Sequence, residues 1–148
     1  MRRRKRTAAA GLAGLLLVGA LTGCSSLGSQ LQSSLTETTS AVRTAELGLS
    51  LRADDRATTA VTSTALTDAL DELTSAANSV TEIETSGSAE SDKREQVLDL
   101  IRRSTDAVNR ARTALTAGGS LASVTSDLAD LGDEADSRLT QYQRKQAQ

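Results

Sequence analysis

Apolar residues recur at alternating spacings of three and four along this chain, from residue 27 to residue 142, and no proline interrupts them. This spacing places the apolar side chains on one face of an α-helix. Because proline is the residue that most sharply breaks a helix, its absence leaves each of these segments free to be helical. The pattern therefore predicts an all-α chain with four stripes: Leu27, Leu31, Leu35, Val42 and Leu49; Leu66, Leu70, Leu73, Ala77 and Val80; Val97, Ile101, Val108, Ala111 and Leu115; and Leu121, Val124, Leu128, Leu131, Ala135, Leu139 and Tyr142.

Glycine and small polar residues mark two of the three breaks between the stripes. Gly118 and Gly119 predict a helix end, and the Ser120 that follows is an expected N-cap. The segment 85–88 is expected to end the second helix, and Ser91 or Asp92 to cap the third. The four helices are thus expected at about residues 30–52, 55–85, 91–117 and 121–145.

The break between the first two helices contains neither glycine nor proline. The distance from Leu49 to Leu66 is 17 residues, which is two heptads plus three, so the phase of the stripe slips there. A turn near residue 53, with Asp54 capping the second helix, restores a common apolar face. The alternative is one helix over roughly residues 28–84, paired with the last two helices in a dimer.

Four helices of similar length joined by short loops favour an antiparallel up-down-up-down bundle. Folding the last two helices about Gly118 brings Arg110 near Asp127 and Arg103 near Glu134. The expected core consists of Leu, Val and Ala, without large aromatic rings, so we expect only modest stability.

The beginning of the chain is a different kind of segment. The basic run Arg2–Arg6 is followed by an apolar stretch over residues 8–21, which is too short to span a membrane and is typical of a signal peptide. The tetrapeptide Leu21-Thr22-Gly23-Cys24 then resembles the lipobox of bacterial lipoproteins. The excess of Arg over Lys and the abundance of Ala, Thr and Asp suggest a GC-rich bacterium, so the resemblance implies a small lipoprotein of actinobacterial type.

The resemblance implies a fate for each part of the chain. Cleavage between Gly23 and Cys24 removes the signal peptide, residues 1–23, and Cys24 carries a diacylglycerol, with an N-acyl group left open. Residues 24–29 form a short tether and residues 30–145 the bundle. The protein is then expected on the outer face of the cell membrane, and no other cofactor is expected.

Cleavage also changes the charge, because five of the 17 basic residues leave and all 19 acidic residues remain. The acidic mature chain is not expected to bind nucleic acid, which requires a basic face. An anchor at Cys24 places the start of the first helix, the loop at 85–92 and the C-terminus near the membrane. The basic residues expected near lipid headgroups are Lys93, Arg94, Arg144 and Lys145.

The turn between the first two helices then lies far from the membrane. It carries Arg52, Asp54, Asp55 and Arg56, which are the candidate partner-facing tip. The fourth helix carries the acidic residues Asp127, Asp130, Asp133, Glu134 and Asp136. Carboxylates distributed around a helix do not converge on a calcium ion, so we expect a solvated face paired with the third helix's arginines, and no metal.

Composition argues against catalysis. The chain has no His, the usual general base near neutral pH, and its single Cys is assigned to the anchor. We therefore expect no enzyme. Three functional hypotheses remain: an interaction module that binds another envelope protein, a sensor or carrier with a small or lipidic ligand between its helices, and a passive structural or oligomeric component of the envelope.

Overall fold

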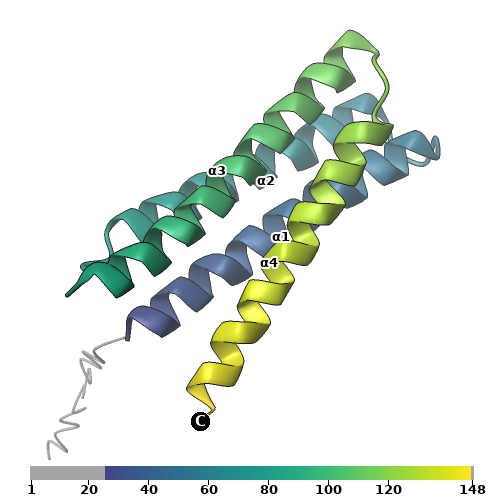
Figure 1. Ribbon diagram of the computed structural model, residues 1–148. Coiled ribbons are helices and arrows are strands. Elements are labelled where there is room, and N and C mark those ends of the chain that lie inside the picture. Colours follow the sequence, from purple (N-terminus) through teal and green to yellow (C-terminus); the bar gives the residue numbers. More distant parts are fainter. Residues whose placement is uncertain (1–25, 148) are drawn as a thin grey trace, which may run out of the picture.

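The computed structural model describes residues 26–147, which form four α-helices joined by short turns (Figure 1). Helix α1 spans Leu27–Ala53, α2 spans Thr59–Thr81, α3 spans Ser88–Ala117 and α4 spans Ala122–Gln146. Consecutive helices run antiparallel and pack against each other. The predicted all-α, up-down-up-down four-helix bundle is confirmed.

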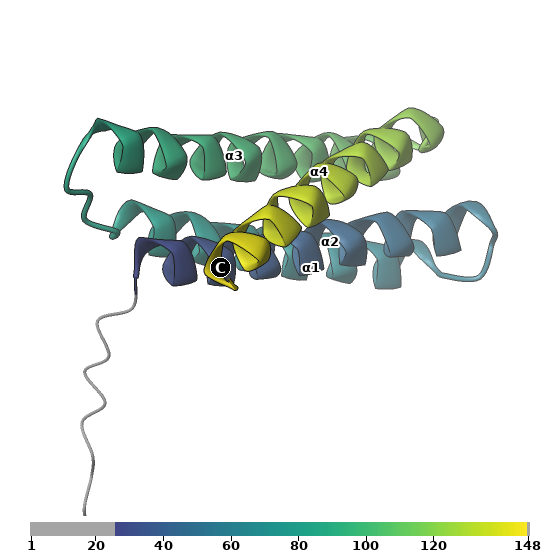
Figure 2. The same cartoon turned by 60° about the horizontal axis from the view of Figure 1, so that its bottom comes forward.

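The four helices are not equally spaced. Helix α1 contacts each of the other three, whereas no described residue of α2 contacts α4. Figure 2 shows that α4 crosses the other helices obliquely, so that its C-terminal end lies away from α3. Helix α4 therefore packs mainly on α1, and its contact with α3 is concentrated near the turn that joins them.

The chain turns between α1 and α2 over residues 54–58, so a single helix over residues 28–84 does not form. Asp54, expected to cap the second helix, is instead the C-cap of α1. The backbone N–H groups of Arg56 and Ala57 bond to the carbonyl of Leu51, and these bonds hold the next residues out of a helix. Helix α2 begins only after Thr58, whose hydroxyl accepts a hydrogen bond from the N–H of Val61.

Two other caps differ from the expectation. Helix α3 begins at Ser88, before Ser91 and Asp92, because Glu90 reaches back and accepts a 2.8 Å hydrogen bond from the N–H of Ser86. Helix α3 ends as expected at Gly118, whose φ of 66° is left-handed. Ser120 does not cap α4, because the N-cap position is Leu121 and no side chain bonds the first free N–H groups.

The core follows the predicted stripes and widens beyond them. Most stripe residues are fully buried, and those near helix ends, such as Leu27, Leu139 and Tyr142, are half-buried against the core. The residues that the stripes missed are mainly alanines and leucines beside them: Ala41, Ala69, Ala76, Ala107, Leu98 and Leu100.

Small residues bring α1 and α2 into close contact. A Cβ atom added to Gly48 would lie 3.2 Å from the Cβ of Ala65, which is tighter than ordinary van der Waals contact. Thr62 lies in the same interface, fully buried, and its hydroxyl donates to the carbonyl of Thr58 at 3.1 Å. Because the two helices lie so close together, small residues such as Ala65 and Gly48 are enough to fill the space between them.

Two polar side chains are fully buried on the core stripes of α1 and α3. The hydroxyl of Thr38 donates to the carbonyl of Ser34 at 2.7 Å. The hydroxyl of Ser104 has no hydrogen-bond partner among the described residues. Burial of an unbonded hydroxyl is destabilising, so Ser104 is a weak point of the core.

Candidate functional site

The proposed anchor lies at the edge of what the structure describes. Gly23 and Cys24, the predicted cleavage and lipidation residues, lie outside the described residues, as does the expected signal peptide. The first described residue, Ser26, is the N-cap of α1, and its hydroxyl accepts a hydrogen bond from the N–H of Ser29. Helix α1 therefore begins at Leu27, three residues after Cys24, and a lipid on Cys24 would hold the bundle within about 10 Å of its attachment point.

The four residues of the candidate partner-facing tip are brought together in the turn that ends α1. Asp55 adopts a φ of 56°, which is unusual for a residue other than glycine. Its N–H bonds to the carbonyl of Arg52, and the N–H of Arg56 bonds to the carbonyl of Leu51 at 2.8 Å. These two bonds form the Schellman arrangement in which a left-handed residue closes a helix.

The side chains of the tip are mostly free to meet a partner. The side chain of Asp55 is 92% exposed, and its carboxylate forms an ion pair with the guanidinium of Arg52 at 3.1 Å. Asp54 and Arg56 are also exposed. An ion pair this exposed contributes between zero and about 1 kcal/mol. Hydrogen bonds therefore fix the backbone of this turn, whereas its charged side chains are held only by a weak, exposed ion pair.

Two exposed apolar side chains flank the tip, and neither is among the residues predicted to face a partner. Leu47 of α1 is 59% exposed and Val61 of α2 is 61% exposed. They are the most exposed large hydrophobic side chains among the described residues, and both lie within two helical turns of residues 54–58. Leu47 lies outside the predicted apolar stripe of α1. An apolar residue off the stripe indicates a hydrophobic side chain that faces solvent, and this pattern could have identified Leu47 from the sequence.

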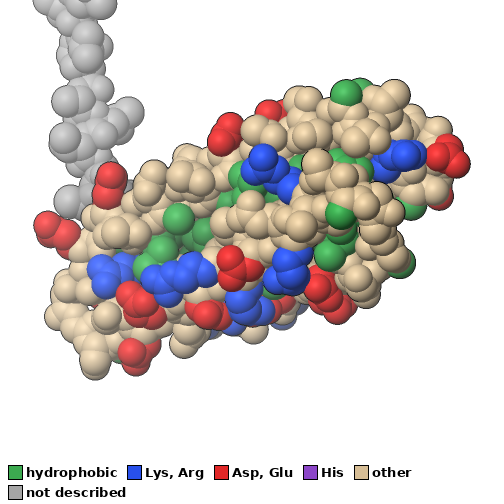
Figure 3. All heavy atoms as spheres, turned by 90° about the horizontal axis from the view of Figure 1, so that it is seen from above, with side chains coloured by type: hydrophobic (Ala, Val, Ile, Leu, Met, Phe, Trp, Pro, Cys, Tyr) green, Lys and Arg blue, Asp and Glu red, His purple; other side chains and the backbone are tan. Residues whose placement is uncertain are grey.

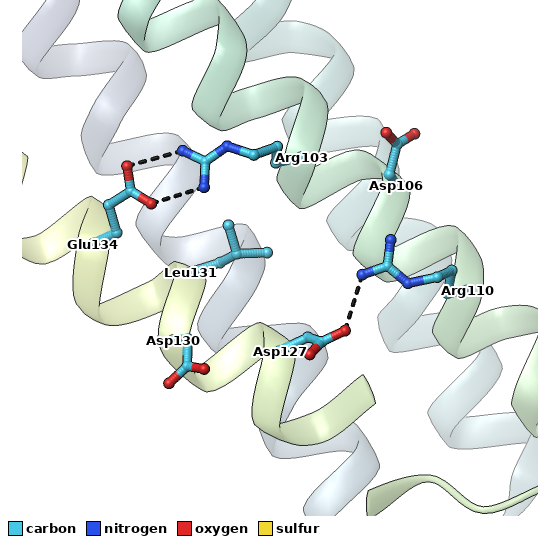
Figure 4. A pocket seen from close by; sticks show the side chains of 7 residues that line it. All are labelled: Arg103, Asp106, Arg110, Asp127, Asp130, Leu131 and Glu134. Atoms are coloured by element: carbon cyan, nitrogen blue, oxygen red, sulfur yellow. Dashed lines mark hydrogen bonds and ion pairs between the residues drawn. The ribbon is translucent and has the colours of Figure 1, made fainter. Parts of the chain in front are cut away.

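A groove of about 420 Å³ runs between α3 and α4, and charged side chains line most of it (Figure 4). Arg103 of α3 forms two parallel hydrogen bonds to Glu134 of α4, at 2.8 and 2.9 Å. Arg110 of α3 bonds to Asp127 of α4 at 3.0 Å. Leu131 lies between these two bridges. The two predicted ion pairs are confirmed, and they cross the groove.

The electrostatics of the groove centre on Glu134. Hydrogen bonds from Arg103, reinforced by Arg138, hold the pKa of Glu134 below its usual value, although partial burial acts in the opposite direction. The same bond to Glu134 raises the pKa of Arg103. Glu134, Arg103 and Arg138 are therefore paired within this cluster and help to hold α3 to α4. Asp106 and Asp130, which also line the groove, have no ion pair with a described residue.

For two of the remaining acidic residues of α4, the predicted pairing with arginines of the third helix is wrong. Asp133 and Asp136 pair with Arg43 of α1, at 2.6 and 3.0 Å, and not with arginines of α3. Gly132 makes room for this arginine, because an added Cβ would lie 2.7 Å from the central carbon of its guanidinium. Arg43 also pairs with Glu46 of its own helix at 2.9 Å. The oblique crossing of α4 over α1 creates this ionic clamp.

Two further properties bear on function. Over the part of the chain that is described, no group of three or more His, Cys, Asp and Glu side chains is placed to hold a metal ion. None of the four helices is both long and apolar enough to cross a membrane.

Figure 3 shows one face of the molecule, where positive and negative side chains alternate beside a furrow in which hydrophobic side chains are visible.

Comparisons of the chain with models of protein families, with curated proteins and with solved structures found no match.

Proposed function

We propose that this protein is a lipid-anchored, non-catalytic interaction module on the outer face of the cell membrane. The observation that carries the proposal is the separation of the two ends of α1. Its N-cap lies two residues after Cys24 of the lipobox-like segment, and its other end forms the tip. A helix of 27 residues separates these ends by about 40 Å.

The chemistry of the tip supports binding to a protein. Residues 54–58 present charged side chains on a backbone fixed by hydrogen bonds, and Leu47 and Val61 add exposed apolar surface nearby. Apolar side chains that a polar rim surrounds are typical of protein–protein contact sites. The partner expected here is another protein of the cell envelope.

The ion-paired groove between α3 and α4 favours this role over that of a ligand carrier. A carrier needs a largely apolar pocket with a few polar groups. The groove instead has the side chains of Arg103 and Arg110 bridging it to acidic residues of α4, and a ligand would have to break these pairs to enter. Catalysis has no support either, since the chain contains no imidazole.

The anchor is tested on protein expressed from the full chain and purified from membranes. Mass spectrometry should show a chain that begins at Cys24 and carries the added mass of a diacylglycerol. Cys24→Ala should release the protein from the membrane fraction. A variant that stays equally membrane-bound would contradict the anchoring proposal.

The interaction is tested by crosslinking on live cells. A photoreactive amino acid at Val61 should capture one discrete envelope protein, whereas the same amino acid at Gln96, an exposed position of α3 near the other end, should not. Capture of a second copy of this chain from both positions would instead favour the passive, oligomeric role. Equal capture of many proteins from the two positions would refute a specific tip.

A further inference from the structure

The net charge of the mature chain is confined to one flank of the bundle. Residues 57–92 contain seven acidic residues and no Lys or Arg. The rest of the chain holds the other 12 of the 19 acidic residues, and 12 of the 17 basic residues also lie there once residues 2–6 are set aside. The remainder is therefore neutral, and the flank carries the whole excess: Asp68, Asp71, Glu72, Glu82, Glu84, Glu90 and Asp92.

This acidic flank consists of α2, the turn from α2 to α3 and the first turn of α3. None of its seven carboxylates takes part in an ion pair with a described residue. Arg94, expected near lipid headgroups, is held within the protein: it is 25% exposed, donates to the carbonyl of Ile83 at 3.1 Å and pairs with Glu95. Lys93 is exposed but lies next to Asp92 in the acidic turn.

The C-terminal end of α4 has the opposite character. No acidic residue follows Asp136, and the last helical turn carries Arg144 and Lys145. Both side chains are exposed, and neither has an ion pair with a described residue. This basic end is therefore free to meet anions from outside the molecule.

The start of α1 lies between these two regions. Figures 1 and 2 both place it between the turn from α2 to α3 on one side and the C-terminal end of α4 on the other. An anchor on Cys24 places both regions at the end of the bundle that faces the bilayer, and the field of a charged bilayer decays over about 8 Å at physiological salt. An anionic bilayer attracts nearby Lys and Arg side chains and repels carboxylates.

We infer that the anchored bundle leans toward α4, so that Arg144 and Lys145 contact anionic lipid headgroups and the acidic flank faces away from the membrane. This inference rests on the proposed anchor at Cys24. It assigns a membrane-contacting surface of two basic residues and leaves α2 directed away from the lipid.

The lone cysteine makes the orientation measurable. Lipidation consumes the thiol of Cys24, so a second cysteine can be labelled uniquely with a fluorophore. Lipidated protein with Gln143→Cys, beside the basic end, is compared with Ser86→Cys, in the acidic turn; both side chains are exposed. Each is reconstituted into vesicles of phosphatidylcholine alone or with phosphatidylglycerol at a 7:3 ratio, and a headgroup-attached quencher reports proximity to the surface.

On the anionic vesicles we expect quenching at position 143 to exceed that at position 86 by about threefold or more. The difference should shrink on neutral vesicles and at high salt, because ions screen the surface charge. Equal quenching at the two positions, or a difference that does not depend on anionic lipid, would overturn the inference.

A charge-matched pair of variants tests which residues orient the bundle. Arg144→Gln with Lys145→Gln should remove most of the difference, whereas Arg56→Gln with Arg112→Gln, which removes two exposed charges from the far half, should keep it. Far-ultraviolet circular dichroism checks that each variant remains helical. Loss of the difference in both pairs would refute the assignment to α4.

The two proposals fail in different ways. Fluorophore on Cys24 of the wild-type protein, or wild-type protein absent from the vesicle fraction, would refute the anchor and the orientation together. An anchored protein whose two probes are quenched equally would refute the orientation alone.

Discussion

Replacing Ser104 by alanine should stabilise the bundle. The Ser104 hydroxyl is fully buried and has no hydrogen-bond partner among the described residues. In the unfolded chain this hydroxyl is hydrated, so folding removes its bonds to water and returns none. The matched control is Thr38→Val, because Thr38 is also fully buried on a core stripe but its hydroxyl bonds to the carbonyl of Ser34.

The expected change in the free energy of unfolding for Ser104→Ala combines three effects. Removing an unbonded buried hydroxyl recovers about 1–3 kcal/mol, and alanine exceeds serine in helix propensity by about 0.5 kcal/mol. The small void left by the oxygen costs at most about 1 kcal/mol. Ser104→Ala should therefore raise the free energy of unfolding by about 1–2 kcal/mol and Tm by roughly 3–10 °C. Thr38→Val should be nearly neutral, because a bonded hydroxyl worth about 1 kcal/mol is exchanged for a buried methyl group worth about 0.8 kcal/mol.

The assay is urea unfolding of residues 24–148 with Cys24→Ser, followed by circular dichroism at the helix band and by Tyr142 fluorescence. The two signals should change together if the domain unfolds in a single transition. If Ser104→Ala lowers the free energy of unfolding or leaves it unchanged while the control is neutral, the hydroxyl has a partner in solution and the reasoning is wrong.

Asp55→Gly should raise the free energy of unfolding by about 0.5–1 kcal/mol, because glycine adopts a left-handed φ without a steric penalty and the lost pair with Arg52 is highly exposed; a decrease in urea denaturation would show that the pair matters more than the backbone. Arg103 lowers the pKa of Glu134, so their pairing stabilises the fold above the unfolded-chain pKa of about 4.3 and this contribution is lost as the pH falls through the lower folded pKa. Glu134→Gln should therefore flatten the pH dependence of stability below about pH 4.3, and a pH dependence identical to that of the parent chain would contradict the assignment. Burial raises the pKa of Tyr142, so its ultraviolet titration should have a midpoint above the usual value of about 10, and the stability it contributes is full below that value and lost as the pH rises through the folded pKa; a midpoint that urea does not lower would show that the ring is not packed.

Much of the fold could be predicted from local pattern. The stripe positions identify the helices because apolar spacing survives any arrangement of them, and the slip in phase between Leu49 and Leu66 located a real turn. The caps were harder: Asp54, Ser91 and Ser120 are good N-cap residues by type but do not act as N-caps here. At Asp54 backbone bonds to the carbonyls of Ser50, Arg52 and Leu51 decided the outcome, and at the start of α3 it was the bond that the Glu90 carboxylate accepts from the N–H of Ser86. Such bonds exist only in the folded chain.

The contacts of the candidate site also divide into those that the sequence could predict and those that depend on the tertiary structure. The ion pairs of Arg103 and Arg110 with acidic residues of α4 could be predicted from antiparallel folding about Gly118. A short turn between two helices fixes which of their residues lie opposite each other. Nothing in the linear sequence brings Arg43 near Asp133, since these residues are 90 positions apart and their contact depends on how α4 crosses α1. The buried alanines beside the stripes were missed for the same reason.

The sequence by itself determined that this protein is helical and that a lipobox-like segment precedes the helices, and it favoured four helices over three, because periodicity and short motifs are local properties of the chain. Only the tertiary structure decided the oblique position of α4, the clamp at Arg43 and the place of the acidic flank relative to the basic end of α4. These depend on crossing angles, which are set by how side chains from distant segments fit together, and by the room that a residue such as Gly132 leaves for its neighbour.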